Sequence, residues 1–258
     1  GLLVALAGEL ARAGTATLLI DDLGYDRALA HRALSLPPPV AVAVLPDAPH
    51  SEAIARAARR TGTDVLLHLP MQAEDVAPRA GTLRVGMAAD TYRSRVSTAL
   101  ASVPGAVGVN NHMGSALTAR RGPMRRFMRE LAGLPRRLVF IDSRTTPDSR
   151  AVAAARAAGV GVARRDVFID HVREPAAIAG QVRRWLEQAR RAGCSLAIAH
   201  PYPETFRILE RVLPRADDVR RVGVERYIEE CGGPASPRPP AMAASGERRG
   251  DAAGATRR

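Results

Sequence analysis

The sequence predicts an α/β fold, a distorted (β/α)7–8 barrel of the TIM type, from three observations. Short apolar runs rich in β-branched residues alternate with Ala/Arg/Glu-rich stretches that have helical spacing. The runs are apolar throughout, which is typical of parallel strands buried on both faces. Polar or ionisable residues follow almost every run, as in barrels whose active site lies where the C-terminal ends of several strands converge. A doubly wound sheet would instead gather such residues at one switch point.

The elements follow in chain order. The apolar runs predict strands at 16–20, 40–45, 64–69, 106–109, 137–141, 161–169, 195–199 and, with a weaker pattern, 219–224. The stretches between them predict helices at 25–34, 50–60, 90–102, 123–132, 147–158, 175–192 and 203–212. Several of these begin with Pro, Ser or Asp, which are favoured at helix N-termini. Neither a GxGxxG turn nor a GxxxxGK[ST] loop occurs, which disfavours a dinucleotide or nucleotide site.

Three segments are predicted along the chain: an N-terminal extension at 1–15, the barrel domain at 16–231 and a disordered tail at 232–258. The opening GLLVALAGEL is apolar, but Glu9 and Arg12 interrupt the apolar run, so it resembles a short helix or the remnant of a longer N-terminus rather than an intact signal peptide. The tail is rich in Pro, Gly, Ala and Arg and has no apolar period. No run reaches the roughly 18 apolar residues of a transmembrane helix.

Composition excludes a wholly disordered chain, because 46% of the 258 residues are hydrophobic. The formal net charge is +12, and every basic residue other than histidine is arginine. That excess permits an anionic partner. However, the chain has one Trp, four Tyr and four Phe and no recognisable reading motif, so we expect no nucleic-acid partner.

Two cysteines make no disulfide framework; Cys194 is expected to be a small buried residue, and a bridge to Cys231 stays open.

Asp21 and Asp22 follow the first predicted strand directly. Two adjacent carboxylates repel one another and are costly to desolvate unless something uses them. One interpretation is that a divalent metal holds one while the other acts as a base. The other is an N-cap for the helix near Tyr25, but a cap needs only one Asp.

Three histidines stand at strand ends. His68 lies in LLHLPM, where a buried core histidine is the simpler interpretation. His112 lies in GVNNHMGS, a dense set of polar groups in which a plain turn would not need the imidazole. His200 lies in AIAHPYPET, where the prolines force an extended exit toward the barrel mouth; packing is an equal alternative.

Further polar residues near these ends are candidates for substrate binding. Alternation places Asp166 and Asp170 on the same side of one strand, where salt bridges to arginine are the alternative. An Asx turn is the alternative for Asp142. The candidates are Asn111, Ser115, Asp142, Asp166 and Asp170. No Gly-x-Ser-x-Gly occurs, and neither cysteine resembles a nucleophile. Aspartates and histidines at strand ends therefore indicate a metal-activated water, with Zn²⁺ or a related divalent ion as cofactor.

Six motifs in order give the sequence a family resemblance. They are LLIDDLG, DVLLHLPM, GVNNHMGS, VFIDSRTT, RRDVFIDH and AIAHPYPET. Together they resemble the divergent polysaccharide deacetylases of bacterial envelopes, over residues 16–228. The resemblance implies a distorted barrel, usually of seven strands, like that of metal-dependent carbohydrate deacetylases.

The resemblance also implies site roles. Asp21 would be the general base and Asp22 a metal ligand, His68 would match the first histidine of the family's H-x-x-x-H metal motif, and His200 would protonate the leaving group. Metal-activated water would attack an acetyl carbonyl. The second histidine of that motif is replaced by Gln72. We hypothesise that His112, from the neighbouring strand, completes the ligand set.

The implied function is a metal-dependent hydrolase that removes acetyl groups from an envelope or cell-wall carbohydrate, with that polymer as its partner. The implied location is periplasmic or exported. One alternative is a non-catalytic glycan- or metal-binding barrel that regulates cell-envelope enzymes. Another is an Arg-rich protein that binds an anionic polymer. The presence of Asp21 and His200 favours the hydrolase, because a binding module needs neither base nor acid.

Overall fold

The computed structural model describes residues 14–232. The predicted tail, apart from Gly232, and nearly all of the predicted extension lie outside these residues. Within them, nine strands form one parallel sheet in the order β6-β5-β4-β3-β2-β1-β8-β7, with β9 paired to β1. The strands are β1 Thr15–Leu23, β2 Ala41–Val44, β3 Val65–Met71, β4 Gly108–Met113, β5 Val139–Asp142, β6 Val162–Arg164, β7 Val167–Phe168, β8 Cys194–Ala199 and β9 Arg220–Arg221.

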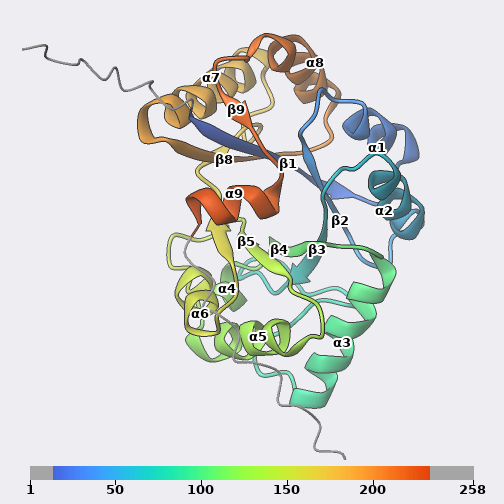
Figure 1. Ribbon diagram of the computed structural model, residues 1–258. Helices are drawn as coiled ribbons and strands as arrows, with labels where there is room; N and C mark the ends of the chain where they lie inside the picture. Colours follow the sequence, from blue (N-terminus) through green and yellow to red (C-terminus); the bar gives the residue numbers. More distant parts are fainter. Residues whose placement is uncertain (1–13, 233–258) are drawn as a thin grey trace, which may run out of the picture.

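Helices follow most strands and surround the curved sheet (Figure 1). They are α1 Arg27–Leu34, α2 Ser51–Arg60, α3 Ala89–Ser102, α4 Ser115–Thr118, α5 Arg121–Gly133, α6 Ala151–Ala157, α7 Pro175–Ala192, α8 Pro203–Val212 and α9 Val224–Cys231, with a 3₁₀ turn at Leu213–Arg215. The distorted barrel that the sequence predicts is confirmed. No helix among residues 14–232 combines the length and the apolar character needed to cross a membrane.

The barrel closes at residues 161–169, where a single strand was predicted. The run 161–169 is not one strand, because β6 ends at Arg164 on one edge of the sheet and β7 begins at Val167 on the other. The N–H of Arg165 donates to Asp142 of β5, and that of Asp166 donates to Leu196 of β8. Three Cα–Cα steps span at most roughly 11 Å, so the two edges of the sheet lie close together. The sheet is therefore curled into a nearly closed barrel.

The core has two layers, as expected for strands buried on both faces. One layer lies between the sheet and the outer helices and contains large side chains such as Trp185, Phe127 and Phe206. The other lies inside the barrel and includes Leu19, Leu66 and side chains from β2, β5 and β8. Both layers are fully or nearly fully buried, so the strand residues alternate between two apolar environments.

The inner layer is completed by α9, which the sequence analysis did not predict. Val224, Tyr227 and Ile228 of this helix join the interior cluster, and Figure 1 shows α9 near the middle of the molecule. Its first N–H donates to Asp64 at 2.7 Å, just before β3. A disulfide joins Cys231, at its end, to Cys194, at the start of β8. The expectation that Cys194 is only a small buried residue is therefore wrong.

Candidate functional site

The polar site lies at the C-terminal ends of β1, β3, β4 and β8. Residues of neighbouring strands meet there because the sheet is parallel and in register, with His68 of β3 opposite Asn110 of β4. The structure brings together five of the residues that the sequence indicates: Asp21, Asp22, His68, His112 and His200. This arrangement follows from the barrel, which aims the ends of its strands at one mouth.

Asp22, His68 and His112 form a compact triad. Asp22 Oδ1 lies 3.0 Å from His68 Nε2 and 3.0 Å from His112 Nδ1, and the two ring nitrogens lie 3.1 Å apart. His68 is buried, whereas Asp22 and His112 are partly exposed. Burial alone would raise the pKa of Asp22, but the two imidazoles hold it far below its ordinary value. The triad is therefore open to solvent on one side and anionic at its centre.

Asn110 fixes which nitrogen of His68 faces the triad. The Asn110 Nδ2 group donates to both carboxylate oxygens of Asp21, at 2.9 and 3.0 Å, so its Oδ1 must face the other way. That oxygen accepts a hydrogen bond from His68 Nδ1 at 2.9 Å. In the neutral ring, Nε2 then carries the lone pair that points at Asp22 and His112. One amide thus orients both a ligand and the carboxylate beside it.

The triad fits a divalent metal ion. Asp22 Oδ1 is buried and finds no hydrogen-bond partner within the described part of the chain, although two imidazole nitrogens lie beside it. Ligands that hold Zn²⁺ tetrahedrally at about 2.0–2.1 Å stand roughly 3.3 Å apart, close to the separations in the triad. Two histidines and one carboxylate leave a further position open, as in catalytic zinc sites.

Asp21 lies beside the triad without belonging to it. Its carboxylate is 2% exposed and approaches His68 Nε2 at 3.7 Å. Burial raises the pKa of Asp21, while the nearby histidines and the Asn110 hydrogen bond only partly offset this. A raised carboxyl pKa suits a group that takes a proton near neutral pH. The N-cap alternative for this pair is excluded, because Asp26 caps α1 through the N–H groups of Ala28 and Leu29.

His200 faces the triad from β8 and is held from behind by Asp170. Its Nε2 lies 3.8 Å from Asp22 Oδ2, and its Nδ1 donates to Asp170 Oδ1 at 2.9 Å. Asp170 Oδ2 accepts from the His200 N–H at 2.7 Å and from Thr205 Oγ1 at 2.9 Å. Burial lowers the pKa of His200, but the Asp170 hydrogen bond and the carboxylates raise it above its ordinary value. An imidazole so oriented can donate a proton toward the triad.

The candidate substrate-binding residues lie outside the triad, and each is hydrogen-bonded to another part of the chain. Asn111 bonds the Met113 carbonyl and the Ser143 N–H, and Ser115 accepts from Glu74 N–H. Asp142 makes the Asx turn that was its alternative, accepting from Arg144 N–H at 2.9 Å. Asp166 accepts a hydrogen bond from the N–H of Leu196, a residue that lies four positions before His200 in β8 and the loop after it. Asp170 is fully engaged with His200 and Thr205. Substrate binding by these residues stays a prediction, and their described bonds are intramolecular.

Asn110 and Gln72 have structural roles that the sequence pattern did not indicate. Alternation along β4 could have found Asn110, because residues two apart in a strand face the same side and His112 was already a candidate. Gln72, at the position of the missing histidine, does not face the triad. Its Oε1 accepts from Val85 N–H and so fastens the loop after β3.

Comparisons with known proteins agree with this architecture. The sequence profile of the divergent polysaccharide deacetylases matches residues 18–227. The uncharacterized protein YibQ of Escherichia coli is 39% identical over 209 residues, which are 81% of this chain and 63% of that protein. The chain thus spans less than two thirds of that relative.

Solved structures share the fold. The uncharacterized protein ATU2773 of Agrobacterium tumefaciens superposes with a TM-score of 0.79 at 23% identity, over 84% of this chain and 89% of that one. A mutant of BA3943 from Bacillus anthracis, a CE4 family pseudoenzyme with restored enzymatic activity, superposes with a TM-score of 0.50 at 13% identity, over 85% and 69%. The profile match covers most of the chain, and the chain belongs to the divergent polysaccharide deacetylase family.

Proposed function

We propose that the protein is a metal-dependent hydrolase that removes acetyl groups from an envelope or cell-wall carbohydrate. One observation carries the proposal: both a buried carboxylate, Asp21, and an Asp-oriented histidine, His200, lie beside the Asp22–His68–His112 triad. A ligand set alone would suit a binding protein. A base and an acid beside it are what hydrolysis requires.

Each residue has a distinct part in this reaction. Asp22, His68 and His112 would hold the ion, for which Zn²⁺ is the best match to the donor set. When bound, such an ion polarises a carbonyl and lowers the pKa of water. Asp21 accepts the proton of the attacking water, and His200 returns a proton to the leaving nitrogen or oxygen. Asn110 and Asp170 act as positioning residues, because each orients a histidine of the site.

An exported location is part of the proposal. The Cys194–Cys231 disulfide supports it, because disulfides persist in oxidising compartments such as the periplasm and are rare in the cytosol. The protein would then meet its carbohydrate substrate in the envelope.

The second candidate function is a non-catalytic glycan- or metal-binding barrel that regulates cell-envelope enzymes. Its support is that BA3943, which shares the fold at a TM-score of 0.50, is described as a pseudoenzyme. A fold of this type therefore does not bring activity with it.

The first experiment is metal analysis by elemental mass spectrometry. Wild type and the His112→Ala and His171→Ala variants are purified and loaded in parallel. His171 is an exposed histidine outside the triad and serves as the matched control. We expect one equivalent of zinc or a similar metal in wild type and in His171→Ala, and loss of it in His112→Ala. Full occupancy in His112→Ala would remove His112 from the ligand set. Absence of metal from reconstituted wild type would favour the binding module.

A further inference from the structure

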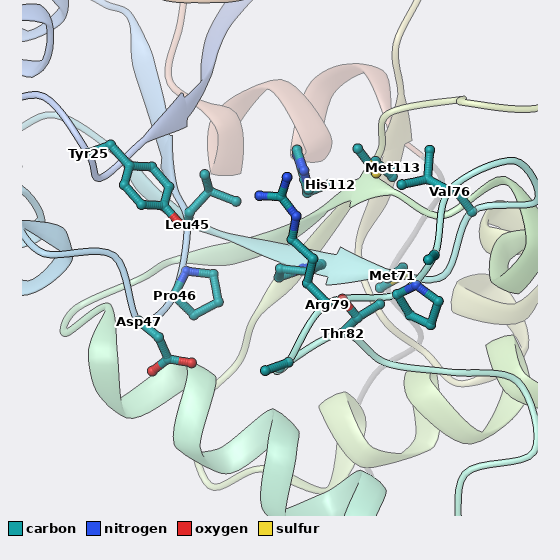
Figure 2. Close-up of a pocket in the computed structure, with 16 residues that line it drawn as sticks. Tyr25, Leu45, Pro46, Asp47, Met71, Val76, Arg79, Thr82, His112 and Met113 are labelled. Atoms are coloured by element: carbon teal, nitrogen blue, oxygen red, sulfur yellow. The ribbon is translucent and has the colours of Figure 1, made fainter.

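A pocket of about 320 Å³ opens beside the triad (Figure 2). His112 belongs both to the triad and to the pocket lining, so the two are continuous. The other walls come from Tyr25 after β1, from the end of β2, from the loop after β3 and from Met113. The volume falls at the lower end of the range of small-molecule sites, roughly 300–1,000 Å³.

The pocket is lined mainly by aliphatic side chains. They are Leu45, Pro46, Pro70, Met71, Ala73, Val76, Ala77, Pro78, Ala80 and Met113. Sugar hydroxyls need hydrogen-bond partners when they leave water, and these ten side chains provide none. The polar side chains of the lining are Tyr25, Asp47, Arg79, Thr82 and His112. Tyr25, Val76 and Met113 are 65%, 47% and 43% exposed, and all three line this one pocket. Large apolar side chains gathered in solvent mark a binding surface.

The pocket wall is anchored and therefore formed before any ligand arrives. The Gln72 N–H donates to Leu83, and the Gln72 carbonyl accepts from Ala116 and Leu117. Met113 has a left-handed backbone with a φ of 54°, which is held because its carbonyl accepts from Asn111 Nδ2 and Thr145 Oγ1. An unfavourable backbone that its neighbours maintain is typical of a functional wall.

We propose that this pocket binds the acyl group of the substrate and that it admits acyl chains longer than acetyl. The inference rests on the hydrolase function proposed above. A substrate held at the triad has two halves, a polar sugar and an acyl group, and the acyl group is the half that matches the aliphatic part of the wall. Its first carbon would lie against His112, where the pocket begins. Arg79 adds a positive charge to the lining, and no ion-pair partner for it occurs among residues 14–232.

The test measures the binding of acetate, butanoate, hexanoate and octanoate, the acids that deacylation would release. Calorimetric titrations are run on metal-loaded and metal-free protein. We expect the affinity to rise about fourfold for each methylene that enters the pocket. Val76→Asp places a charge in the pocket and should abolish this rise. Val85→Asp is the matched control, because Val85 is 40% exposed but does not line the pocket, and it should retain the rise.

Turnover is measured separately, with esters that share one leaving group and differ in acyl length. Tight octanoate binding without hydrolysis of any ester would uphold the pocket and contradict the hydrolase. Hydrolysis of acetyl esters with equal affinity for acetate and octanoate would uphold the hydrolase and overturn the pocket proposal. If the protein loads no metal, the hydrolase proposal fails. The pocket proposal is then tested by whether the affinity of the metal-free protein for the acids rises with their chain length. An unaltered rise in Val76→Asp would also overturn the proposal.

Discussion

Asp22 adopts a left-handed backbone conformation with a φ of 60°, and the pairing of β1 with β2 shifts register between Ile20 and Leu23. In a regular strand, adjacent side chains point to opposite faces, so Asp21 and Asp22 could not share a site. The irregular end of β1 aims both carboxylates at the same centre. Such conformations are uncommon for residues other than glycine and are found where function maintains them.

The carboxylate of Asp21 can be tested apart from metal binding. We expect Asp21→Asn to retain the metal, because Asp21 is not in the triad, and to lose turnover by roughly 10²–10⁴-fold, the contribution of general base catalysis. Deacylation rates and metal content are measured on the same preparation. Turnover at the wild-type rate would refute the assignment of Asp21 as the base.

Asn110 and Asn111 form a natural pair for testing the positioning role. Both are buried and hydrogen-bonded, so Asn110→Ala and Asn111→Ala should each destabilise folding. Only Asn110 contacts His68, and loss of such a partner typically weakens metal affinity by about 10–100-fold. Competition with a chromogenic chelator measures this affinity. Equal affinities of the two variants would contradict the role of Asn110.

At the scale of elements, sequence pattern predicts best where local chemistry and tertiary structure agree. The predicted helices at 175–192 and 203–212 coincide with α7 and α8, each of which begins at a proline. The run 161–169 is apolar enough for one strand, yet it is divided because the barrel must close there. Local pattern does not record where the two edges of a sheet meet. Similarly, α9 was missed because its apolar face is explained only by the barrel interior that it fills.

The disulfide between β8 and α9 provides a prediction at this scale. It closes a segment of 37 residues in sequence separation, for which loss of chain entropy in the unfolded state stabilises the fold by roughly 3–4 kcal/mol. We expect Cys194→Ala/Cys231→Ala to unfold in urea with a free energy lower by about this amount.

Reduction gives the control for this experiment. Dithiothreitol should lower the stability of wild type to that of the double variant and leave the variant unchanged. An unchanged urea midpoint on reduction of wild type would show that the covalent link adds nothing to the packing of α9.

At the scale of the whole molecule, the sequence indicates where the site lies but not which side chains turn into it. The rule that barrel sites lie at the C-terminal ends of strands placed His68, His112 and His200 together correctly. Asp142 and Asp166, which the same rule made candidates for substrate binding, accept hydrogen bonds from backbone N–H groups, and their part in substrate binding stays a prediction. Which side chains turn inward depends on register and bulges that only the closed sheet determines.

The order of the strands also determines when each strand can pair with its neighbours during synthesis. β1 lies between β2 and β8, and its Thr15 pairs with Cys194 near the other end of the described chain. β1 is synthesised before β2 to β7, and the edge of β1 that pairs with β8 stays uncovered until β8 follows. Contacts between such distant parts of a chain form slowly and leave apolar strand edges exposed meanwhile. A nascent chain of this topology therefore remains open to binding by chaperones until β8 has been synthesised.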